Sequence, residues 1–245
     1  MSDKRSEPEQ EHASKVRGMF AEISARYDLL NHLLSGNMDK RWRRRVANEV
    51  RRDLQSSDDR ILDVASGTGD LALTLFESTG ARIVGTDFCR PMLELAARKA
   101  LRRATPIPFV EGDALKLPFR SDAFDGVTIA FGLRNLSNVE IGLSELFRVL
   151  KPGGRVAVLE FSKPVLPGFR TLFQFYFVRV LPLLGGIVSG SRSAYQYLPA
   201  SVSNFPDQER LASLMIEIGF GQVEYQNLTG GIAAIHLGTK PQRLP

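Results

Sequence analysis

Short apolar runs alternate with helical patterns through the middle of the chain, and this alternation limits the fold more than any other feature. Five runs have the length and composition of strands, at residues 60–66, 82–88, 107–113, 124–132 and 155–161. Strands that alternate with helices build βαβ units, which form a parallel sheet with helices on both faces. We therefore predict an α/β fold with a doubly wound, mostly parallel sheet.

The alternation stops after residue 161. Residues 162–203 form a long insertion, which we expect to be largely helical. A helix is predicted within PDQERLASLMIEIGF, because Pro206 precedes it and Gly219 follows its last apolar position. Two strand-like stretches then flank TGG at residues 229–231. This spacing predicts an antiparallel hairpin that brings the sheet to seven strands.

The N-terminal part of the chain divides into a tail and a lobe. Residues 1–12 are charged and lack the apolar segment of a signal peptide, so we expect a disordered tail there. Residues 13–50 have a helical pattern rich in arginine, and we expect a helical lobe in front of the domain formed by residues 51–245. The apolar stretch at 169–190 is interrupted by charges and by Pro182. A spanning helix needs about 20 predominantly apolar residues, so we predict no membrane span.

Composition limits the size of the core and the possible metal and disulfide chemistry, but it does not identify a function. A chain of 245 residues that is 43% hydrophobic can bury one sizeable core. Its net charge of +5 is compatible with nucleic acid, anionic lipid or simple solubility. Cys89 is the only cysteine, which excludes an internal disulfide and a cysteine-cluster metal site. We expect a cytoplasmic protein and find no cluster of metal ligands.

A glycine-rich turn follows the first predicted strand in LDVASGTGDLAL. Gly67 and Gly69 allow the backbone to pass close to a ligand, and the start of the next helix offers free amides. Asp87 ends the second predicted strand about twenty residues later, where a carboxylate can accept from both hydroxyls of a ribose. The combination predicts an adenosine-type ligand, with a tight turn and a surface carboxylate as the alternative. The spacing of Gly67, Gly69 and Ala72 also matches the pattern of dinucleotide-binding proteins, but the chain has no Tyr-x-x-x-Lys pair for hydride chemistry.

The segment DVASGTGD resembles the first motif of methyltransferases that use S-adenosylmethionine (SAM). Asp63 fills the place of the acidic residue before the glycines, and Thr68 lies between the two glycines. The resemblance implies that Asp63, Gly67, Thr68 and Gly69 all contact the cofactor. The segment EGDALKLPF resembles the part of that fold that flanks the adenine. The resemblance places Asp113 and Ala114 at this contact, and the alternative is that Asp113 caps a turn. We therefore take SAM as the predicted cofactor.

Two longer segments, YDLLNHLLSGNMDKRW and RVLKPGGRVAVLEFS, resemble the signatures of the ubiquinone/menaquinone biosynthesis C-methyltransferase family. AFGLRN and SAYQYLPASVSNFP are similar to that family too, so the resemblance runs from about residue 15 to 240. The chain departs from the family pattern at Leu30, at Ala130 and at Asp39, which we expect to cap a helix over 39–50. The resemblance implies a seven-stranded, Rossmann-like class I methyltransferase with a helical N-terminal lid and a substrate-side insertion.

The family resemblance implies methyl transfer to a ring carbon of a prenylated hydroquinone. That carbon becomes nucleophilic when a neighbouring hydroxyl loses its proton, and a phenol has an ordinary pKa of about 10. Arg134 follows the fourth strand and can donate two hydrogen bonds to the phenolate, while Asn135 can orient the ring or a water. The alternative reading is an arginine–carboxylate bridge and an asparagine cap for a helix over 138–149.

Other parts of the chain are candidates for the substrate side. By resemblance, Tyr27 and Asn31 are lid contacts. Tyr195 and Tyr197 can turn hydroxyls toward the quinol, and the aromatic residues of 169–177 form either a groove for the prenyl tail or ordinary core.

The basic runs KRWRRRV and RKALRR form either solvated helix faces or a peripheral contact with an anionic membrane at its inner face. Two other functions stay open, methylation of another hydrophobic small molecule and RNA binding. FGLRN lacks the Asn/Asp-Pro-Pro-Tyr pattern of enzymes that methylate bases, so we expect no nucleic acid partner. A homodimer is compatible with the sequence.

Overall fold

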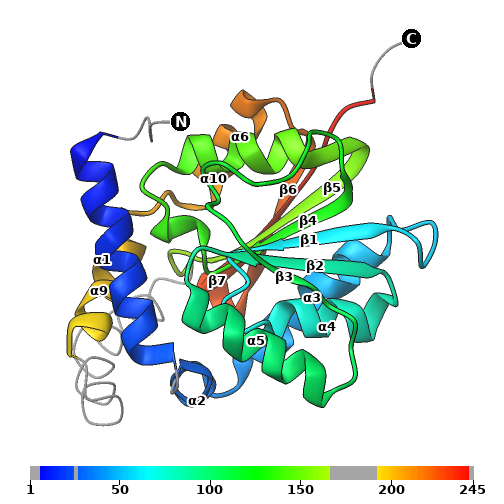
Figure 1. The fold of residues 1–245 in the computed structure, drawn as a ribbon. Coiled ribbons are helices and arrows are strands. Elements are labelled where there is room, and N and C mark those ends of the chain that lie inside the picture. The colour runs from blue at the N-terminus through cyan, green and yellow to red at the C-terminus, as the bar shows by residue number, and fades with distance from the viewer. Residues whose placement is uncertain (1–5, 25–26, 166–191, 243–245) are drawn as a thin grey trace.

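The computed structural model describes residues 6–24, 27–165 and 192–242. Its described residues form one seven-stranded sheet with the order β3-β2-β1-β4-β5-β7-β6 (Figure 1). The first five strands are parallel, and β7 runs antiparallel to both β5 and β6. The predicted doubly wound sheet with an antiparallel C-terminal hairpin is confirmed. The strands are β1 (Arg60–Val64), β2 (Arg82–Asp87), β3 (Phe109–Glu111), β4 (Phe124–Ala130), β5 (Leu150–Phe161), β6 (Gly221–Leu228) and β7 (Ala233–Thr239).

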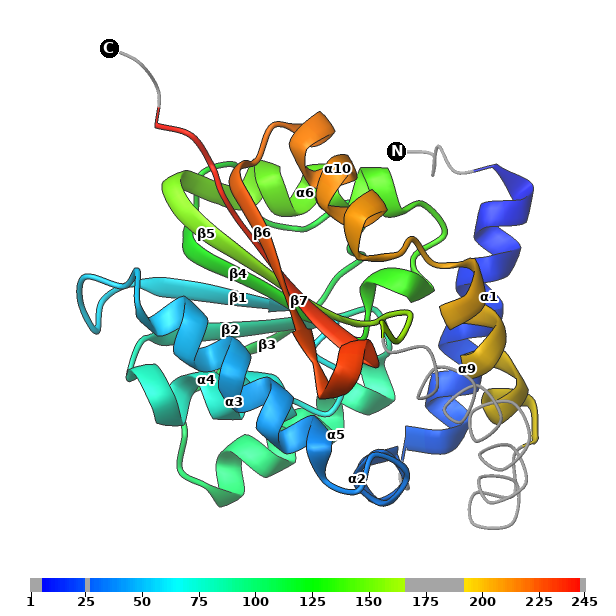
Figure 2. The same ribbon diagram turned by 180° about the vertical axis from the view of Figure 1, so that it is seen from behind.

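Helices cover both faces of the sheet, as Figures 1 and 2 show. On one face α3 (Met38–Arg51), α4 (Asp70–Thr79) and α5 (Arg90–Arg102) pack on the strands, and on the other lie α6 (Val139–Val149) and α10 (Gln208–Ile218). β1 and β4 carry almost only buried residues, because a central parallel strand is covered on both sides. Local signals set the helix ends: Asn138 caps α6, and Asp207 and Gly219 cap the two ends of α10.

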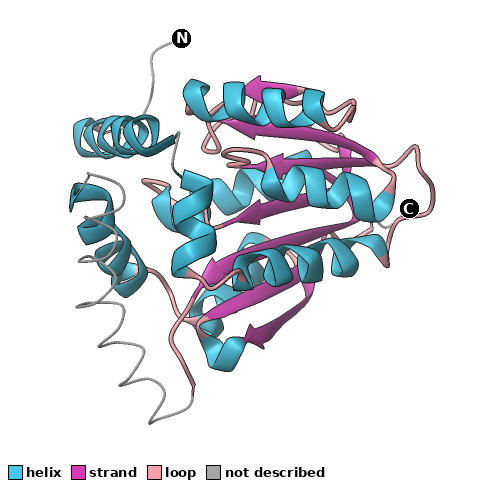
Figure 3. Ribbon diagram, turned by 90° about the horizontal axis from the view of Figure 1, so that it is seen from below, coloured by secondary structure: helices cyan, strands magenta, loops and turns pink. Residues whose placement is uncertain are grey.

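Three further helices gather near the carboxyl ends of the parallel strands. They are α1 (Glu7–Ile23), α2 (Tyr27–Leu34) and α9 (Arg192–Asn204), and Figure 3 shows α1 and α9 side by side beyond the sheet. Short 3-10 turns follow β4 at Leu133–Asn135 and β6 at Thr229–Gly231. The N-terminal lobe predicted at 13–50 therefore consists of α1, α2 and α3. Of the insertion at 162–203, residues 166–191 lie outside the described residues, including the aromatic residues at 169–177.

Three local predictions are corrected. The tail predicted over 1–12 ends earlier, because α1 begins at Glu7, where the Glu9 carboxylate accepts from the backbone amide and hydroxyl of Ser6. Asp39 does not cap α3; Asn37 occupies the cap position, and the Asp39 side chain is buried against His32 and Arg43. β5 starts at Leu150 rather than at residue 155, since Leu150 pairs with Phe124 and an irregularity follows in the register with β4.

Candidate active site

A pocket opens at the carboxyl ends of β1, β2 and β4, on the side where α1 and α2 lie. Ala13, Phe20 and Tyr27 from these two helices line one wall. The opposite walls come from the segments after each strand, namely Ala65 and Gly67 after β1, Asp87, Phe88 and Met92 around the end of β2, Gly112 to Leu115 after β3, and Ala130 to Gly132 with Asn135 to Ser137 after β4. In a doubly wound sheet this edge is where ligands bind.

The two glycines of the loop after β1 serve different purposes. Both have left-handed backbones, with φ of +55° at Gly67 and +82° at Gly69. A Cβ at Gly67 would meet nothing within 4 Å, and Gly67 lines the pocket, so its backbone is open to a ligand. A Cβ at Gly69 would lie 3.0 Å from the Ala96 side chain. Gly69 does not line the pocket; its glycine allows α4 to pack closely against α5.

Asp87 holds the glycine loop and lines the pocket at the same time. Its Oδ2 accepts from the Gly67 amide at 2.8 Å, and its Oδ1 accepts from the Cys89 amide at 2.8 Å. Burial raises the pKa of Asp87, and the hydrogen bonds from backbone amides act in the opposite direction. Each carboxylate oxygen has a second lone pair, so Asp87 can still accept from ribose hydroxyls. Asp87 therefore lies in the pocket wall, and its contact with a ribose stays a prediction.

Asp63 lies behind the loop instead of in the pocket wall. Its Oδ1 accepts from the Thr128 hydroxyl at 2.8 Å, and burial raises its pKa from the ordinary value to about 7. Within the described residues, Asp63 Oδ2 and the Ser66 hydroxyl are buried and have no hydrogen-bond partner. Buried polar atoms normally have partners. Neither Asp63 nor Ser66 lines the pocket, so the part of the glycine loop that is open to a polar ligand such as the amino-acid end of SAM is the backbone at Gly67.

The predicted adenine contacts lie together on the pocket wall. Asp113 and Ala114 both line the pocket after β3. Asp113 Oδ1 also accepts from the Leu115 amide at 2.9 Å, so the turn-capping reading is present as well. Thr68, by contrast, does not line the pocket. Its hydroxyl bonds to Asp28 of α2 and to Lys99 of α5.

Backbone strain marks the junction of β1 and β4 at the pocket. Ala65 and Phe131 follow these two strands, line the pocket and have positive φ angles of 50° and 56°. Such conformations are costly for residues with a side chain and cluster at functional sites. A Cβ at Gly132 would lie 2.5 Å from the Ala65 Cβ, so glycine is required there for the two strand ends to meet.

Arg134 is fixed at the end of β4 by a carboxylate from the end of β5. Its Nη1 lies 2.6 Å from Glu160 Oε1 and donates to the Phe131 carbonyl at 2.7 Å. The side chains are 7% and 2% exposed, and the Arg134 guanidinium also lies over the Phe161 ring at 5.2 Å. The arginine–carboxylate bridge that the sequence offered as an alternative is therefore present. Among the described residues Arg134 Nε is buried and has no hydrogen-bond partner.

Asn135 lines the pocket and joins the strand end to the surrounding helices. Its Nδ2 donates to the Phe131 carbonyl at 3.0 Å, and its Oδ1 accepts from the Tyr197 hydroxyl of α9 at 3.1 Å. The His12 ring of α1 lies 3.2 Å from the Asn135 carbonyl oxygen. The alternative role of Asn135 as a helix cap is wrong, because Asn138 caps α6.

The substrate-side candidates have different surroundings. Burial raises the pKa of Tyr27, and a hydrogen bond from Asn31 opposes this, so Asn31 holds Tyr27 and does not itself line the pocket. Tyr197 is placed beside Asn135, whereas the side chain of Tyr195 lies outside the described residues. Sequence reasoning missed Glu160 and Phe20. Glu160 ends the strand next to β4, so the order of strands could have indicated it as the partner of Arg134.

Comparison with known proteins gives the relationship directly. The model of the ubiE/COQ5 methyltransferase family matches residues 8–240. A demethylmenaquinone methyltransferase of Thermus thermophilus is 54% identical over 91% of this chain and 100% of its own. The demethylmenaquinone methyltransferase of Deinococcus radiodurans is 48% identical over 94% of this chain and 95% of its own. The ubiquinone/menaquinone biosynthesis C-methyltransferase UbiE of Geobacter sp. is 45% identical over 94% and 98%.

Solved structures support the fold alone, since their sequence identities are low. A SAM-dependent methyltransferase of Thermotoga maritima, titled a possible histamine N-methyltransferase, has a TM-score of 0.63 at 17% identity and covers 92% of this chain and 99% of its own. The [4+2]-cyclase SpnF has a TM-score of 0.61 at 21% identity and covers 81% of each chain. The match over nearly the whole sequence and the pocket at the strand ends lead to one conclusion. This chain belongs to the ubiE/COQ5 methyltransferase family and takes its methyl group from S-adenosylmethionine.

Proposed function

We propose that this methyltransferase methylates a ring carbon of a prenylated hydroquinone. Demethylmenaquinol is the first substrate to consider, because the relatives that are 54% and 48% identical are named for it. The benzoquinol precursor of ubiquinone is the second, because relatives at 45% identity carry the joint ubiquinone/menaquinone name.

The observation that carries the proposal is the charge of Arg134 beside two phenolic side chains. Burial raises the pKa of Tyr27 and of Tyr197, and the positive charge of Arg134 lowers the pKa of both. A quinol hydroxyl is a phenol with the same ordinary pKa of about 10. A quinol ring bound near these tyrosines would have its phenolate stabilised by the same charge.

The chain's own residues have to make the ring carbon nucleophilic and keep water away. Bound SAM supplies a methyl group that is already activated by its sulfonium. Arg134 offers Nε as a donor to the phenolate, while Glu160 and the Phe131 carbonyl hold the Nη1 side of the guanidinium. Asn135, fixed by Tyr197 and by the Phe131 carbonyl, orients the ring on the adjacent wall. Phe20 and Tyr27 close the pocket from the lid side and exclude water.

This assignment changes the role first predicted for Arg134. Glu160 and the Phe131 carbonyl occupy Nη1, so a ligand can meet only the Nε and Nη2 side of the guanidinium. Glu160 neutralises part of the charge, and it raises the pKa of Tyr197 accordingly. Glu160 also prevents the guanidinium from turning away, which preorganises the remaining donor. We assign to Arg134 the directed Nε donor and a local positive field.

Label transfer tests the function. Purified protein is incubated with methyl-labelled SAM and reduced demethylmenaquinone, in parallel with the benzoquinol precursor and with a sterol. We expect label in menaquinone, and label in the benzoquinol product would extend the range to both. Absence of label in both quinols, from protein that binds SAM, would refute the proposal, and label in the sterol would favour another hydrophobic substrate.

We also propose that the outer face of α3 contacts anionic lipid, where a prenylated substrate lies. The exposed side chains of this face include Lys40, Arg41, Arg44 and Arg51, while its acidic residues, Asp39 and Glu49, are buried on the inner side. Each basic residue near such a surface contributes about 1 kcal/mol. In the part of the chain that the structure describes, no helix is both long and apolar enough to span a bilayer.

Vesicle binding tests this contact. The protein should sediment with phosphatidylglycerol vesicles and not with phosphatidylcholine vesicles. Changing Arg41 and Arg44 together to glutamine should release it. Unchanged sedimentation of that variant would contradict the assignment of α3, and salt-sensitive binding of RNA through the same residues would instead support the nucleic acid alternative.

A further inference from the structure

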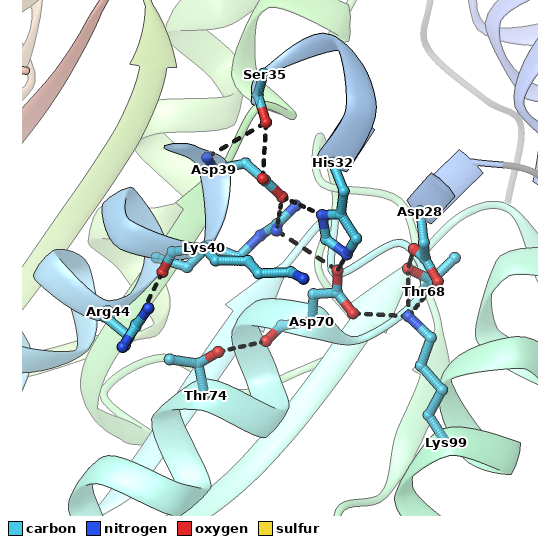
Figure 4. Close-up of polar contacts among 11 residues, drawn as sticks. Asp28, His32, Ser35, Asp39, Lys40, Arg44, Thr68, Asp70, Thr74 and Lys99 are labelled. Atoms are coloured by element: carbon cyan, nitrogen blue, oxygen red, sulfur yellow. Dashed lines mark hydrogen bonds and ion pairs between the residues drawn. The ribbon is translucent and has the colours of Figure 1, made fainter. Parts of the chain in front are cut away.

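A cluster of charged side chains ties the lid helix α2 to the glycine loop, and neither the family resemblance nor the pocket required it. Figure 4 labels its members other than Arg43, and the cluster draws on four parts of the chain. Asp28 and His32 belong to α2, Asp39 and Arg43 to α3, Thr68 and Asp70 to the loop and first turn of α4, and Lys99 to α5.

Lys99 is the centre of the cluster. Its ammonium lies 2.5 Å from Asp28 Oδ2, 2.6 Å from Asp70 Oδ1 and 3.1 Å from the Thr68 hydroxyl. A lysine ammonium has three donors, so each is directed at one acceptor. The Thr68 hydroxyl in turn donates a hydrogen bond to Asp28 Oδ1 at 2.5 Å. Lys99 therefore binds the lid, the glycine loop and α4 at once.

This arrangement is sheltered enough to matter energetically. The side chains of Lys99, Asp28 and Asp70 are only 24%, 30% and 21% exposed. Ion pairs on an open surface contribute little, whereas removing one partner of a sheltered pair leaves a poorly solvated charge. Without Lys99, the carboxylates of Asp28 and Asp70 would face the same region with no ammonium between them.

A second set of contacts completes the cluster on the α3 side. Asp39 Oδ2 lies 2.8 Å from His32 Nδ1 and 2.5 Å from Arg43 Nη1. Arg43 Nη1 also lies 3.5 Å from Asp70 Oδ2. Asp70 thus faces Lys99 with one oxygen and Arg43 with the other. Because Asp70 is the first residue of α4, its negative charge is also favoured by the helix dipole.

The cluster lies directly behind two residues that line the donor pocket. Asp28 follows Tyr27, which lines the pocket and packs edge-on against Phe20 of α1 at 5.9 Å. Thr68 follows Gly67, whose backbone is open to the pocket. Holding Asp28 and Thr68 together therefore fixes the lid wall and the loop wall relative to each other.

We propose that Lys99 is a positioning residue that, through Asp28 and Thr68, latches α2 over the SAM pocket and slows release of the cofactor. Thr68 then contributes to SAM binding through the latch and not as a direct ligand. The inference rests on the SAM pocket and is independent of which quinol is methylated.

The test compares Lys99→Met, Asp28→Asn and the double variant in the full chain. S-adenosylhomocysteine is the probe, with affinity measured by calorimetry and dissociation by stopped-flow fluorescence. Each single change should raise the dissociation constant and the dissociation rate about tenfold, because each removes the sheltered ion pair between Lys99 and Asp28. The double variant should resemble either single one, because both remove the same latch. Lys99→Arg should recover part of the affinity.

Glu77→Gln is the matched control. Glu77 of α4 pairs with Arg103, the residue that follows α5, but both side chains are about half exposed and lie outside the cluster. This variant should bind S-adenosylhomocysteine as the wild type does. Hydrogen exchange of α2 amides with S-adenosylhomocysteine bound should rise in Lys99→Met and stay unchanged in Glu77→Gln.

Wild-type dissociation rates in both single variants would overturn the proposal, as would full additivity in the double variant or unchanged exchange in α2. If Lys99→Met does not fold, Asp28→Asn carries the same measurements. Failure of the quinol assay would leave these results intact, because the probe binds without a methyl acceptor.

Discussion

Replacing Arg134 by lysine separates the charge of this residue from its hydrogen-bonding geometry. The lysine keeps a positive charge beside Glu160, so the buried pair at the ends of β4 and β5 survives. Removing the cation altogether would break a pair whose partners are 7% and 2% exposed, at a cost of about 3–5 kcal/mol. That is a large part of an ordinary domain's stability, so a neutral variant would report on folding and not on catalysis.

The expected loss in Arg134→Lys comes from the Nε donor. A lysine that replaces the Nη1 contacts to Glu160 and the Phe131 carbonyl has no second donor in the position of Nε. Loss of one donor to a developing oxyanion costs about 3–4 kcal/mol of activation free energy, or roughly 100- to 1000-fold in kcat. Transfer of labelled methyl to the quinol gives kcat, and calorimetry should give an unchanged Kd for SAM.

Arg148→Lys is the control for this prediction. Arg148 also pairs with a carboxylate, that of Glu145, and donates to two backbone carbonyls. Arg134 is followed by Asn135, which lines the pocket, whereas neither Arg148 nor its neighbours along the chain line it. Its lysine variant should keep the wild-type kcat. Near-wild-type turnover in a folded Arg134→Lys enzyme would refute the role given to Nε.

Three further predictions concern two residues that line the pocket, Asp87 and Gly132, and one behind its glycine loop, Asp63. Asp87→Ala should weaken SAM binding at least tenfold by calorimetry, through loss of the ribose acceptor and of the contact with the Gly67 amide; unchanged affinity would remove the ribose assignment. Because the folded-state pKa of Asp63 is raised to about 7, its contribution to stability is fully present below the unfolded pKa and is lost as pH rises through about 7. The free energy of unfolding of the wild type should therefore fall relative to Asp63→Asn between about pH 4 and pH 7, by up to about 4 kcal/mol in denaturant titrations, and a constant difference would contradict the buried acid. Gly132→Ala should lower stability by about 1–3 kcal/mol, because its Cβ would lie 2.5 Å from that of Ala65; an unchanged Tm would show that the strand ends can separate.

The sheet and its helices follow from periodicity and turn residues. Continuous apolar runs identified the central strands, and TGG marked the hairpin between β6 and β7. The ends of the strands were less predictable, because pairing with the neighbouring strand decides where a strand begins and ends. β3 has only three residues, since Gly85, Thr86 and Asp87 are the partners that β2 offers it. At the N-terminus, the high charge of residues 1–12 predicts disorder. The capping signal of Ser6 and Glu9 nevertheless starts α1 at Glu7, before the predicted residue 13.

The site was predictable where a motif and the order of the strands together place a residue. Gly67 and Asp87 meet because parallel neighbours β1 and β2 end together, and strand order alone brings them to one edge. Thr68 and Lys99 are thirty-one residues apart and belong to different elements. No local pattern links them, so the sequence predicts Thr68 as a cofactor contact and places Lys99 in a basic run that is either a solvated helix face or a contact with anionic membrane. The sequence predicts Asp39 as a helix cap, since nothing local shows that His32 and Arg43 are its partners. These side chains come together only in the folded lobe.

The central claim is that the SAM pocket and the Arg134 end of β4 serve one reacting ring. A crystal structure with S-adenosylhomocysteine and a short-chain demethylmenaquinol tests it most directly. We expect the ribose at Asp87 and one quinol oxygen within about 3 Å of Arg134 Nε. A ring bound away from Arg134, with the donor pocket filled, would contradict the account.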